Sequence, residues 1–298
     1  MTQVELVEGE VRGATFLESL APGSISVVGP LHDASPALRL LLEAGAYVRV
    51  VPEPARPGAD LTGAAVVVVT TPSALKDPAV AAAREAGVLV LSDLDVAWLV
   101  QGVETFAIAG GAETATQLAA AALGTHARFV NILGTDEGGG YGEPDFLVVA
   151  PSSDQLATMQ VFRPRVAVML RGANPLAVRL TARQSARDCL VLLDDDPIMV
   201  RLARATRAHV VWLSTGHPLE HGVYVEDGFI AARLNGYVEE ICPAPRLSPV
   251  YLEDALAAVA CALWAGLDPG LIGKTLTRRF ATERVGADRI GRQVRRAG

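Results

Sequence analysis

The chain has 298 residues, half of them apolar, and a net charge of −7 at pH 7. This length suits two ordinary α/β domains or one large one, and the acidic balance argues against broad nucleic-acid binding. No apolar run reaches the ~18 residues of a membrane span, the acidic N-terminus is unlike a signal peptide, and the three cysteines form no metal pattern. We therefore expect a cytoplasmic protein without a bound metal.

Apolar strands and amphipathic helices alternate through residues 24–100. The run at 64–70 is apolar on both faces, which is typical of a strand inside a parallel sheet. Alternation of this kind predicts a Rossmann-like, doubly wound sheet. The turn after the first strand lacks the further glycines of a dinucleotide site, so NAD is not expected. Strands are predicted at 24–29, 47–51, 64–70 and 88–91, helices at 35–45 and 77–87, and a short connecting helix at 93–100.

Residues 104–123 read as a strand, a glycine turn and a helix. The strand ends at Ala109, and Gly110 and Gly111 lead into a helix from about Thr114. Loops that bind phosphate follow this plan, because the N–H groups at a helix N-terminus hold an anion. An ATP site carries Gly-Lys-Ser/Thr at this point, whereas the chain has Glu113 and Thr114, and a carboxylate there repels phosphate. The stretch predicts the shape of a phosphate loop without its chemistry.

The rest of the chain continues as α/β structure. Asp227-Gly228 sits between two alternating runs and predicts a hairpin over 223–233. The Arg-rich tail from 284 is typical of a solvated tail or a severed linker. We place a domain boundary at residue 100, giving domains 1–100 and 101–298. Further strands are predicted at 129–133, 145–150, 166–170, 189–193 and 209–213, and helices at 251–264 and 271–280.

Several motifs look functional and have plainer interpretations. Gly273-Lys274-Thr275 spells the end of a phosphate loop but lies in a predicted helix. His217 and His221 have a zinc-peptidase spacing, yet the surrounding Gly and Pro favour a loop. The acidic run 194–196 is typical of a turn before a helix, and the glycine loop 138–142 is either a flexible loop or a lid. Six arginines form either a solvated face or a set of anion ligands: Arg163, Arg165, Arg171, Arg179, Arg183 and Arg187.

The order of these motifs resembles the Mur ligase family, and most closely its D-glutamate-adding members. The resemblance covers about residues 24–280, and no single motif in it is intact. It implies an N-terminal Rossmann-like domain of the UDP-binding type and a central P-loop-like ATPase domain; the chain stops where the family's third domain would begin. The segments that carry the resemblance are Val69–Ser73, Ser92–Asp95, Ile108–Thr116, Leu147–Leu156 and Phe162–Leu170.

The chain departs from the family pattern at the catalytic positions. Thr114 stands where the family has its phosphate-loop lysine, and Ala150 stands where it has a Mg²⁺-holding Glu. Asn174-Pro175 replaces an Asp-His pair, and no lysine between Lys76 and Lys274 can supply the family's carbamylated lysine. An acyl-phosphate ligase needs such groups to stabilise charge on the transferred phosphoryl group. We therefore expect neither ATP nor Mg²⁺, although the family uses both, and assign no catalytic residue.

The resemblance leaves a candidate sugar-nucleotide site in place. Ser152, Ser153 and Gln155 match a family Ser-Ser-x-Gln that contacts or supports the substrate, and a helix N-cap is an equally good interpretation of the serines. Asn131 matches a family Asn to within one residue. Because ligands sit beyond the carboxyl ends of parallel strands, we expect these side chains to face Leu31 and His32 across a cleft between the domains.

The sequence supports three hypotheses about function. The first is a binding or scaffold protein of cell-wall precursor metabolism without ligase activity of its own. The second is an ATP-dependent amino-acid ligase that a partner chain completes, and the third is a structural paralogue that serves assembly alone. The candidate partners are a UDP-N-acetylmuramoyl precursor, another protein and a second copy of the chain.

Overall fold

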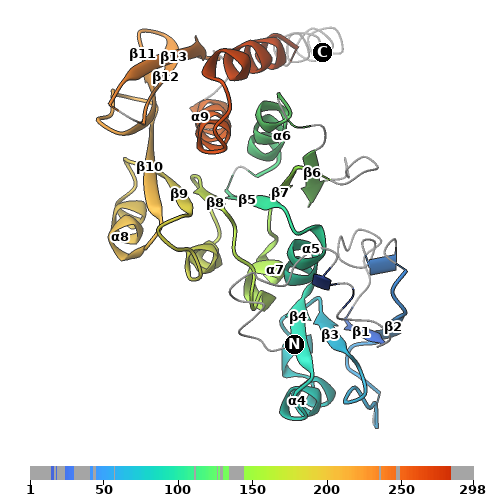
Figure 1. The fold of residues 1–298 in the computed structure, drawn as a ribbon. Helices are drawn as coiled ribbons and strands as arrows, with labels where there is room; N and C mark the ends of the chain where they lie inside the picture. The colour runs from blue at the N-terminus through green and yellow to red at the C-terminus, as the bar shows by residue number, and fades with distance from the viewer. Residues whose placement is uncertain are drawn as a thin grey trace, which may run out of the picture.

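The computed structural model contains two β-sheets flanked by helices (Figure 1). It describes residues 15, 16, 18, 24–29, 41, 42, 45–56, 58–110, 112–125, 127, 130–133, 144–234, 236–245 and 249–282. Within these residues the strands form one sheet of four, here called the N-terminal sheet, and one sheet of nine, here called the large sheet. The predicted α/β class with a Rossmann-like N-terminal sheet and a second α/β sheet is confirmed.

The N-terminal sheet is parallel throughout, in the order β2-β1-β3-β4. All four residues of β3 are buried, as expected for a strand that is apolar on both faces. The Asp77 carboxylate accepts a hydrogen bond from the backbone N–H of Ala79 and caps the helix α4. The elements are β1 (Ile25–Val28), β2 (Val48–Val51), β3 (Val66–Val69), α4 (Pro78–Glu85) and β4 (Leu89–Ser92).

The large sheet has the order β13-β12-β11-β10-β9-β8-β5-β7-β6. It is parallel from β6 to β11 and antiparallel in β11, β12 and β13. Asp227 and Gly228 both have positive φ, at 50° and 83°, which confirms the predicted hairpin. The strands are β5 (Glu104–Ala109), β6 (Val130–Leu133), β7 (Phe146–Val149), β8 (Val166–Met169), β9 (Cys189–Leu193), β10 (His209–Ser214), β11 (Gly222–Glu226), β12 (Phe229–Arg233) and β13 (Val238–Pro243).

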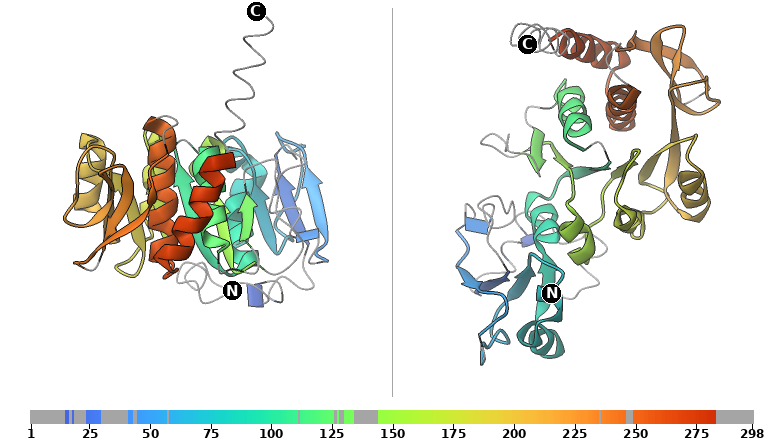
Figure 2. Two further views of the ribbon diagram at one scale, coloured as in Figure 1. Left: turned by 90° about the horizontal axis from the view of Figure 1, so that it is seen from above. Right: turned by 180° about the vertical axis from the view of Figure 1, so that it is seen from behind.

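Helices cover both faces of the large sheet (Figure 2). The two helices α6 and α9 pack on each other on one face, and α8 packs against β9. Gly273, in the helical stretch 269–282, lies so close to the Ile241 carbonyl that a Cβ would come within 2.0 Å of the oxygen. Residues 273–275, which resemble the end of a phosphate loop in sequence, therefore lie in a helix that packs against the backbone of Ile241. The helices are α5 (Asp93–Gln101), α6 (Ala112–Leu123), α7 (Ser153–Thr158), α8 (Pro197–Ala205), α9 (Pro249–Trp264) and the 3-10 helix η2 (Pro175–Thr181).

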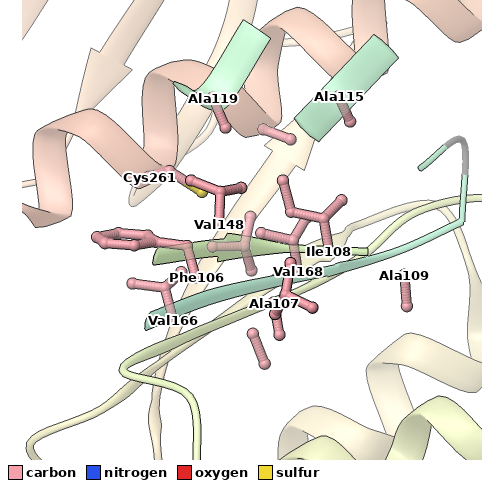
Figure 3. Close-up of a cluster of buried hydrophobic side chains, with 14 of the residues drawn as sticks. Phe106, Ala107, Ile108, Ala109, Ala115, Ala119, Val148, Val166, Val168 and Cys261 are labelled. Carbon is pink, nitrogen blue, oxygen red and sulfur yellow. The ribbon is translucent and has the colours of Figure 1, made fainter. Parts of the chain in front are cut away.

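The interior of the large sheet is built around β5. Five of its six residues are buried, and Figure 3 shows Phe106 and Ile108 among valines of the neighbouring strands. Ala115 and Ala119 of α6 and Cys261 of α9 approach the same strands (Figure 3). Small side chains at these positions let the two helices lie close to the sheet and to each other, and burying this apolar surface stabilises the fold.

One contiguous apolar cluster reaches from β1 and β3 through α5 to β5. Helix α5 is buried along seven of its nine residues, so it acts as a central support between the sheets. The predicted boundary at residue 100 falls inside this helix, and the division into 1–100 and 101–298 stays a prediction. No helix in the described part of the chain is long and apolar enough to cross a membrane.

A buried carboxylate, Asp95, ties α5 to the segment that enters β8. Its Oδ1 accepts hydrogen bonds from the backbone N–H groups of Val161 and Phe162, at 2.9 and 2.7 Å. Its Oδ2 accepts from Gln160 N–H and from both the N–H and the hydroxyl of Ser92, each at 2.8 Å. A fully buried carboxylate is stable only when its lone pairs are satisfied in this way.

We predict that Asp95→Asn destabilises the protein by about 3 kcal/mol, because the new NH₂ group would face backbone donors where the carboxylate oxygen accepted from them. Chemical denaturation measures the change. The matched control is Asp154→Asn, which makes the same replacement at an exposed carboxylate and should leave stability within about 0.5 kcal/mol of wild type. Equal effects of the two substitutions would contradict this account of Asp95.

Candidate functional site

The glycine turn after β5 is pressed against the loop that follows β8. Gly110 has φ of +85°, and a Cβ at this position would lie 2.6 Å from the carbonyl oxygen of Leu170 and 3.0 Å from the backbone nitrogen of Ala173. Only glycine fits, both for its backbone conformation and for lack of space. The glycine therefore serves the close contact between two strand ends.

The first turn of α6 presents a carboxylate. Glu113 is exposed and Thr114 is half-buried, while Ala115 and Thr116 are buried. A glutamate in the first turn of a helix interacts favourably with the partial positive charge of the helix N-terminus. The same charge is what would hold a phosphate. Glu113 of the first turn therefore provides a negative charge near the partial positive charge of the helix N-terminus.

Ser152 and Gln155 form a capping box at the start of α7. The Ser152 hydroxyl accepts from the Gln155 N–H at 3.2 Å, and the Gln155 side-chain oxygen accepts from the Ser152 N–H at 2.9 Å. From the sequence, a helix N-cap and a substrate contact were equally good interpretations of the two serines. For Ser152 the local geometry is that of a cap.

Ser153 and Gln155 connect α7 to its neighbours. The Gln155 amide donates to the Asp93 carboxylate at 3.0 Å, which joins the end of β7 to the end of β4 in the other sheet. The Asn174 amide donates to the Ser153 hydroxyl at 2.7 Å, and its oxygen caps η2 by accepting from Leu176. Ser153 is exposed and its partner Asn174 is half-buried, so this pair is the part of the group that a ligand could reach.

Asp93 has unusual electrostatics for a carboxyl at a strand end. Burial raises its pKa to about 6, although the hydrogen bond from Gln155 favours the ionised form. Its other oxygen accepts from the Leu94 N–H at 2.8 Å. A carboxyl with this pKa between two sheets changes charge close to neutral pH. The sequence did not identify Asp93 as a site residue, because the residues around it give no sign that Gln155 of α7 donates a hydrogen bond to it.

Charged side chains at the ends of β8, β9 and β10 pair with one another. The Arg171 guanidinium donates to Glu253 of α9 at 2.9 Å and to Asp195 at 2.9 and 3.1 Å, and these partners raise its pKa. His217 pairs with Asp194 at 2.9 Å. The Arg171 cation at this edge of the sheet could hold an anion, but it is already engaged by two carboxylates.

The arginines around β8 also have internal partners. Arg163 pairs with Asp188 at 2.8 Å, Arg165 binds the Arg187 carbonyl, and Arg179 donates to the last carbonyls of α7. Arg171 is paired as described above. The sequence left two interpretations of these arginines open, a solvated face or a set of free anion ligands. Neither describes these four side chains, because the arginines hold loops and helix ends in place.

Several predicted site residues lie outside the described residues. These are Leu31, His32, Gly111 and the loop 138–142, and for Asn131 only the backbone in β6 is described. In the described part of the chain, no group of three or more His, Cys, Asp or Glu residues could hold a metal ion. The candidate site is therefore the cluster of Asp93, Ser153, Gln155 and Asn174.

In sequence, the chain is similar to enzymes that share one name. No protein-family model matches the chain. It is 36% identical over 156 residues to a UDP-N-acetylmuramoylalanine–D-glutamate ligase of Pelotomaculum thermopropionicum, covering 47% of the chain and 34% of the relative. It is 31% identical over 274 residues to the enzyme of that name from Geobacter metallireducens, covering 83% of the chain and 60% of the relative. The chain thus matches between a third and three fifths of the length of these relatives.

Solved structures resemble the fold. The chain matches a UDP-N-acetylmuramate:L-alanyl-gamma-D-glutamyl-meso-diaminopimelate ligase from Neisseria meningitides with a TM-score of 0.57 at 16% identity, covering 86% of the chain and 98% of that structure. A murein peptide ligase from Psychrobacter arcticus matches with a TM-score of 0.53 at 12% identity, covering 85% of the chain and 68% of that structure. At these identities the likeness shows a similar fold.

We predict that Gly110→Ala destabilises the protein by about 2 kcal/mol or more, because it combines a strained φ with a clash against backbone. Thermal unfolding measures the loss. Gly216→Ala is the matched control, since a Cβ there meets nothing within 4 Å. If Gly110→Ala and Gly216→Ala have the same melting temperature, the close contact at Gly110 does not constrain the residue there.

We predict that Asp254→Asn stabilises the protein at high pH only. Burial raises the pKa of Asp254 from 3.8 to about 7, helped by the nearby Glu253, and its Oδ1 has no hydrogen-bond partner in the described part of the chain. The folded state keeps this proton where the unfolded chain has released it, so stability falls as pH rises from about 4 to about 7.

The variant removes that loss because an amide does not ionise. Above pH 7 it should melt roughly 2–6 °C above wild type, and near pH 4 the two should coincide. Glu85→Gln, at an exposed helical carboxylate, should show no such pH-dependent difference. A constant difference across the pH range would rule out titration of Asp254 as the cause.

Proposed function

Because the chain belongs to the Mur ligase family, we propose that it is a D-glutamate-ligase-like protein of peptidoglycan precursor metabolism that binds a precursor without ligating it. The first relatives are named UDP-N-acetylmuramoylalanine–D-glutamate ligases. The observation that carries the proposal is the first turn of α6, where an exposed carboxylate, Glu113, stands in the turn that would bind a phosphate.

The proposal that ATP chemistry is lost is supported by the side chains near the strand ends, which pair with carboxylates of the protein itself. Phosphoryl transfer relies on cations and a metal to stabilise developing negative charge. Arg171 is held between Asp195 and Glu253, and His217 is paired with Asp194. Bringing a triphosphate to this edge would place it beside carboxylates and break ion pairs that the protein makes with itself. We therefore propose that neither ATP nor Mg²⁺ is used.

The retained binding site is proposed at the junction of the two sheets, beside α7. The Ser153 hydroxyl and the Asn174 amide are uncharged groups that can hydrogen-bond a sugar or a diphosphate without a metal. Asp93 is buried and acts through the hydrogen bond that its carboxylate accepts from Gln155. Gln155 acts as a positioning residue, because both ends of its amide are already bonded. The ligand class is a UDP-N-acetylmuramoyl precursor.

We predict that calorimetry detects no Mg²⁺-ATP binding tighter than about 100 μM, equivalent to roughly 5 kcal/mol. UDP-N-acetylmuramoyl-L-alanine at millimolar concentration should raise the melting temperature, since a ligand of the folded state stabilises it. Ser153→Ala should weaken this effect several-fold without changing the melting temperature of the free protein. Thr282→Ala, which removes an exposed hydroxyl on the last described helix, should behave as wild type.

The outcomes separate the hypotheses. No shift with any UDP-sugar would remove the binding function and leave a scaffold role. Stoichiometric Mg²⁺-ATP binding would defeat the proposal. ADP release with precursor and D-glutamate, appearing only when a second protein is added, would favour a ligase that a partner chain completes.

A further inference from the structure

Two histidines meet at the amino end of β10, away from the site described above. His209 is the first residue of β10 and His221 immediately precedes β11. Their Nε2 atoms lie 2.9 Å apart, and their rings are nearly perpendicular, at 78°. We propose that His209 and His221 form a binding site for one divalent transition-metal ion, Cu²⁺ or Ni²⁺, with the remaining coordination positions open to water.

The separation of the two nitrogens matches one class of metal geometry. Nitrogen ligands ~2.05 Å from a metal lie ~2.9 Å apart when their bonds are perpendicular, and ~3.3 Å apart in a tetrahedral site. Perpendicular bonds are those of neighbouring positions in square-planar and octahedral complexes, which Cu²⁺ and Ni²⁺ favour. In the absence of a metal the same distance lets the two rings share one proton as an N–H···N hydrogen bond.

The orientation of the His221 ring favours metal binding. The ring hydrogen-bonds to the backbone of Leu234, and because Nε2 faces His209, this bond falls to Nδ1. An Nδ1–H that donates to a carbonyl leaves the lone pair on Nε2, and orienting partners of this kind are typical of metal-bound histidines.

The second ligand is oriented and accessible. The His209 ring stacks on Trp264 of α9 with centroids 5.2 Å apart and an interplanar angle of 27°, which fixes its direction. His209 is exposed, so an ion can enter from solvent. On binding, the shared proton leaves Nε2 of His209 for Nδ1 or for water, and each ring then offers a lone pair to the ion.

This site differs from the metal motif seen in the sequence. The sequence favoured a loop over a metal site for the His217–His221 spacing, and His217 pairs with Asp194 at the carboxyl end of β9. The partner of His221 comes from the start of the preceding strand. His217 therefore serves as an internal control, being a histidine a few residues away that takes no part in the site.

The test uses the full chain without a polyhistidine tag, titrated with CuCl₂ in a weakly coordinating buffer. Calorimetry should show one ion per chain, and Trp264 should report it through quenching of tryptophan fluorescence. His209→Ala and His221→Ala should each weaken binding by at least roughly tenfold, and His217→Ala should bind as wild type. Melting temperatures check that each variant is folded.

A further variant, Trp264→Phe, keeps an aromatic ring over His209 and should retain the affinity while losing much of the quenching. Wild-type affinity in the His209→Ala/His221→Ala double variant would overturn the proposal, and so would equal weakening by His217→Ala. Neither outcome bears on precursor binding beside α7, so the two proposals fail independently.

Discussion

The Asp95 carboxylate is the interaction on which the arrangement of the two sheets depends. It accepts five hydrogen bonds, two from Ser92 at the end of β4 and three from the backbone of residues 160–162. A buried carboxylate is costly unless it is satisfied, and here the satisfied state requires both parts of the chain to be in place. The position of α7, and with it Gln155 and Ser153, follows from that constraint.

The polar groups at the strand ends are mostly engaged by the protein itself. Gln155 bonds Ser152 and Asp93, Arg171 bonds Glu253 and Asp195, and Glu113 lies at the end of α6. Internal pairing lowers the affinity for an anion because each contact with a ligand must replace one that already exists. This pairing is the physical reason for proposing a binding role with modest affinity in place of phosphoryl transfer.

Much of the fold could be predicted from the residues alone. Buried strands such as β3 and β9 are continuous apolar runs, Asp77 and Gly87 mark the ends of α4, and Asp227-Gly228 fixes a hairpin. Strand β13 was missed because it alternates weakly and exists through pairing with β12. The candidate site was half predicted: Ser153 and Gln155 carry a motif, whereas Asp93 and Asn174 acquire their roles through contacts with α7.

The sequence by itself determined the local properties of this protein. Periodicity set its strands and helices, and Glu113 and Thr114 stand where the family resemblance would place the glycine and lysine of a phosphate loop. Tertiary structure alone decided which groups meet: Asp95 with residues 160–162, Asp93 with Gln155, and His209 with His221. The reason is that burial, pKa and ligand geometry arise between residues far apart in the chain, where spacing along the sequence carries no information about distance.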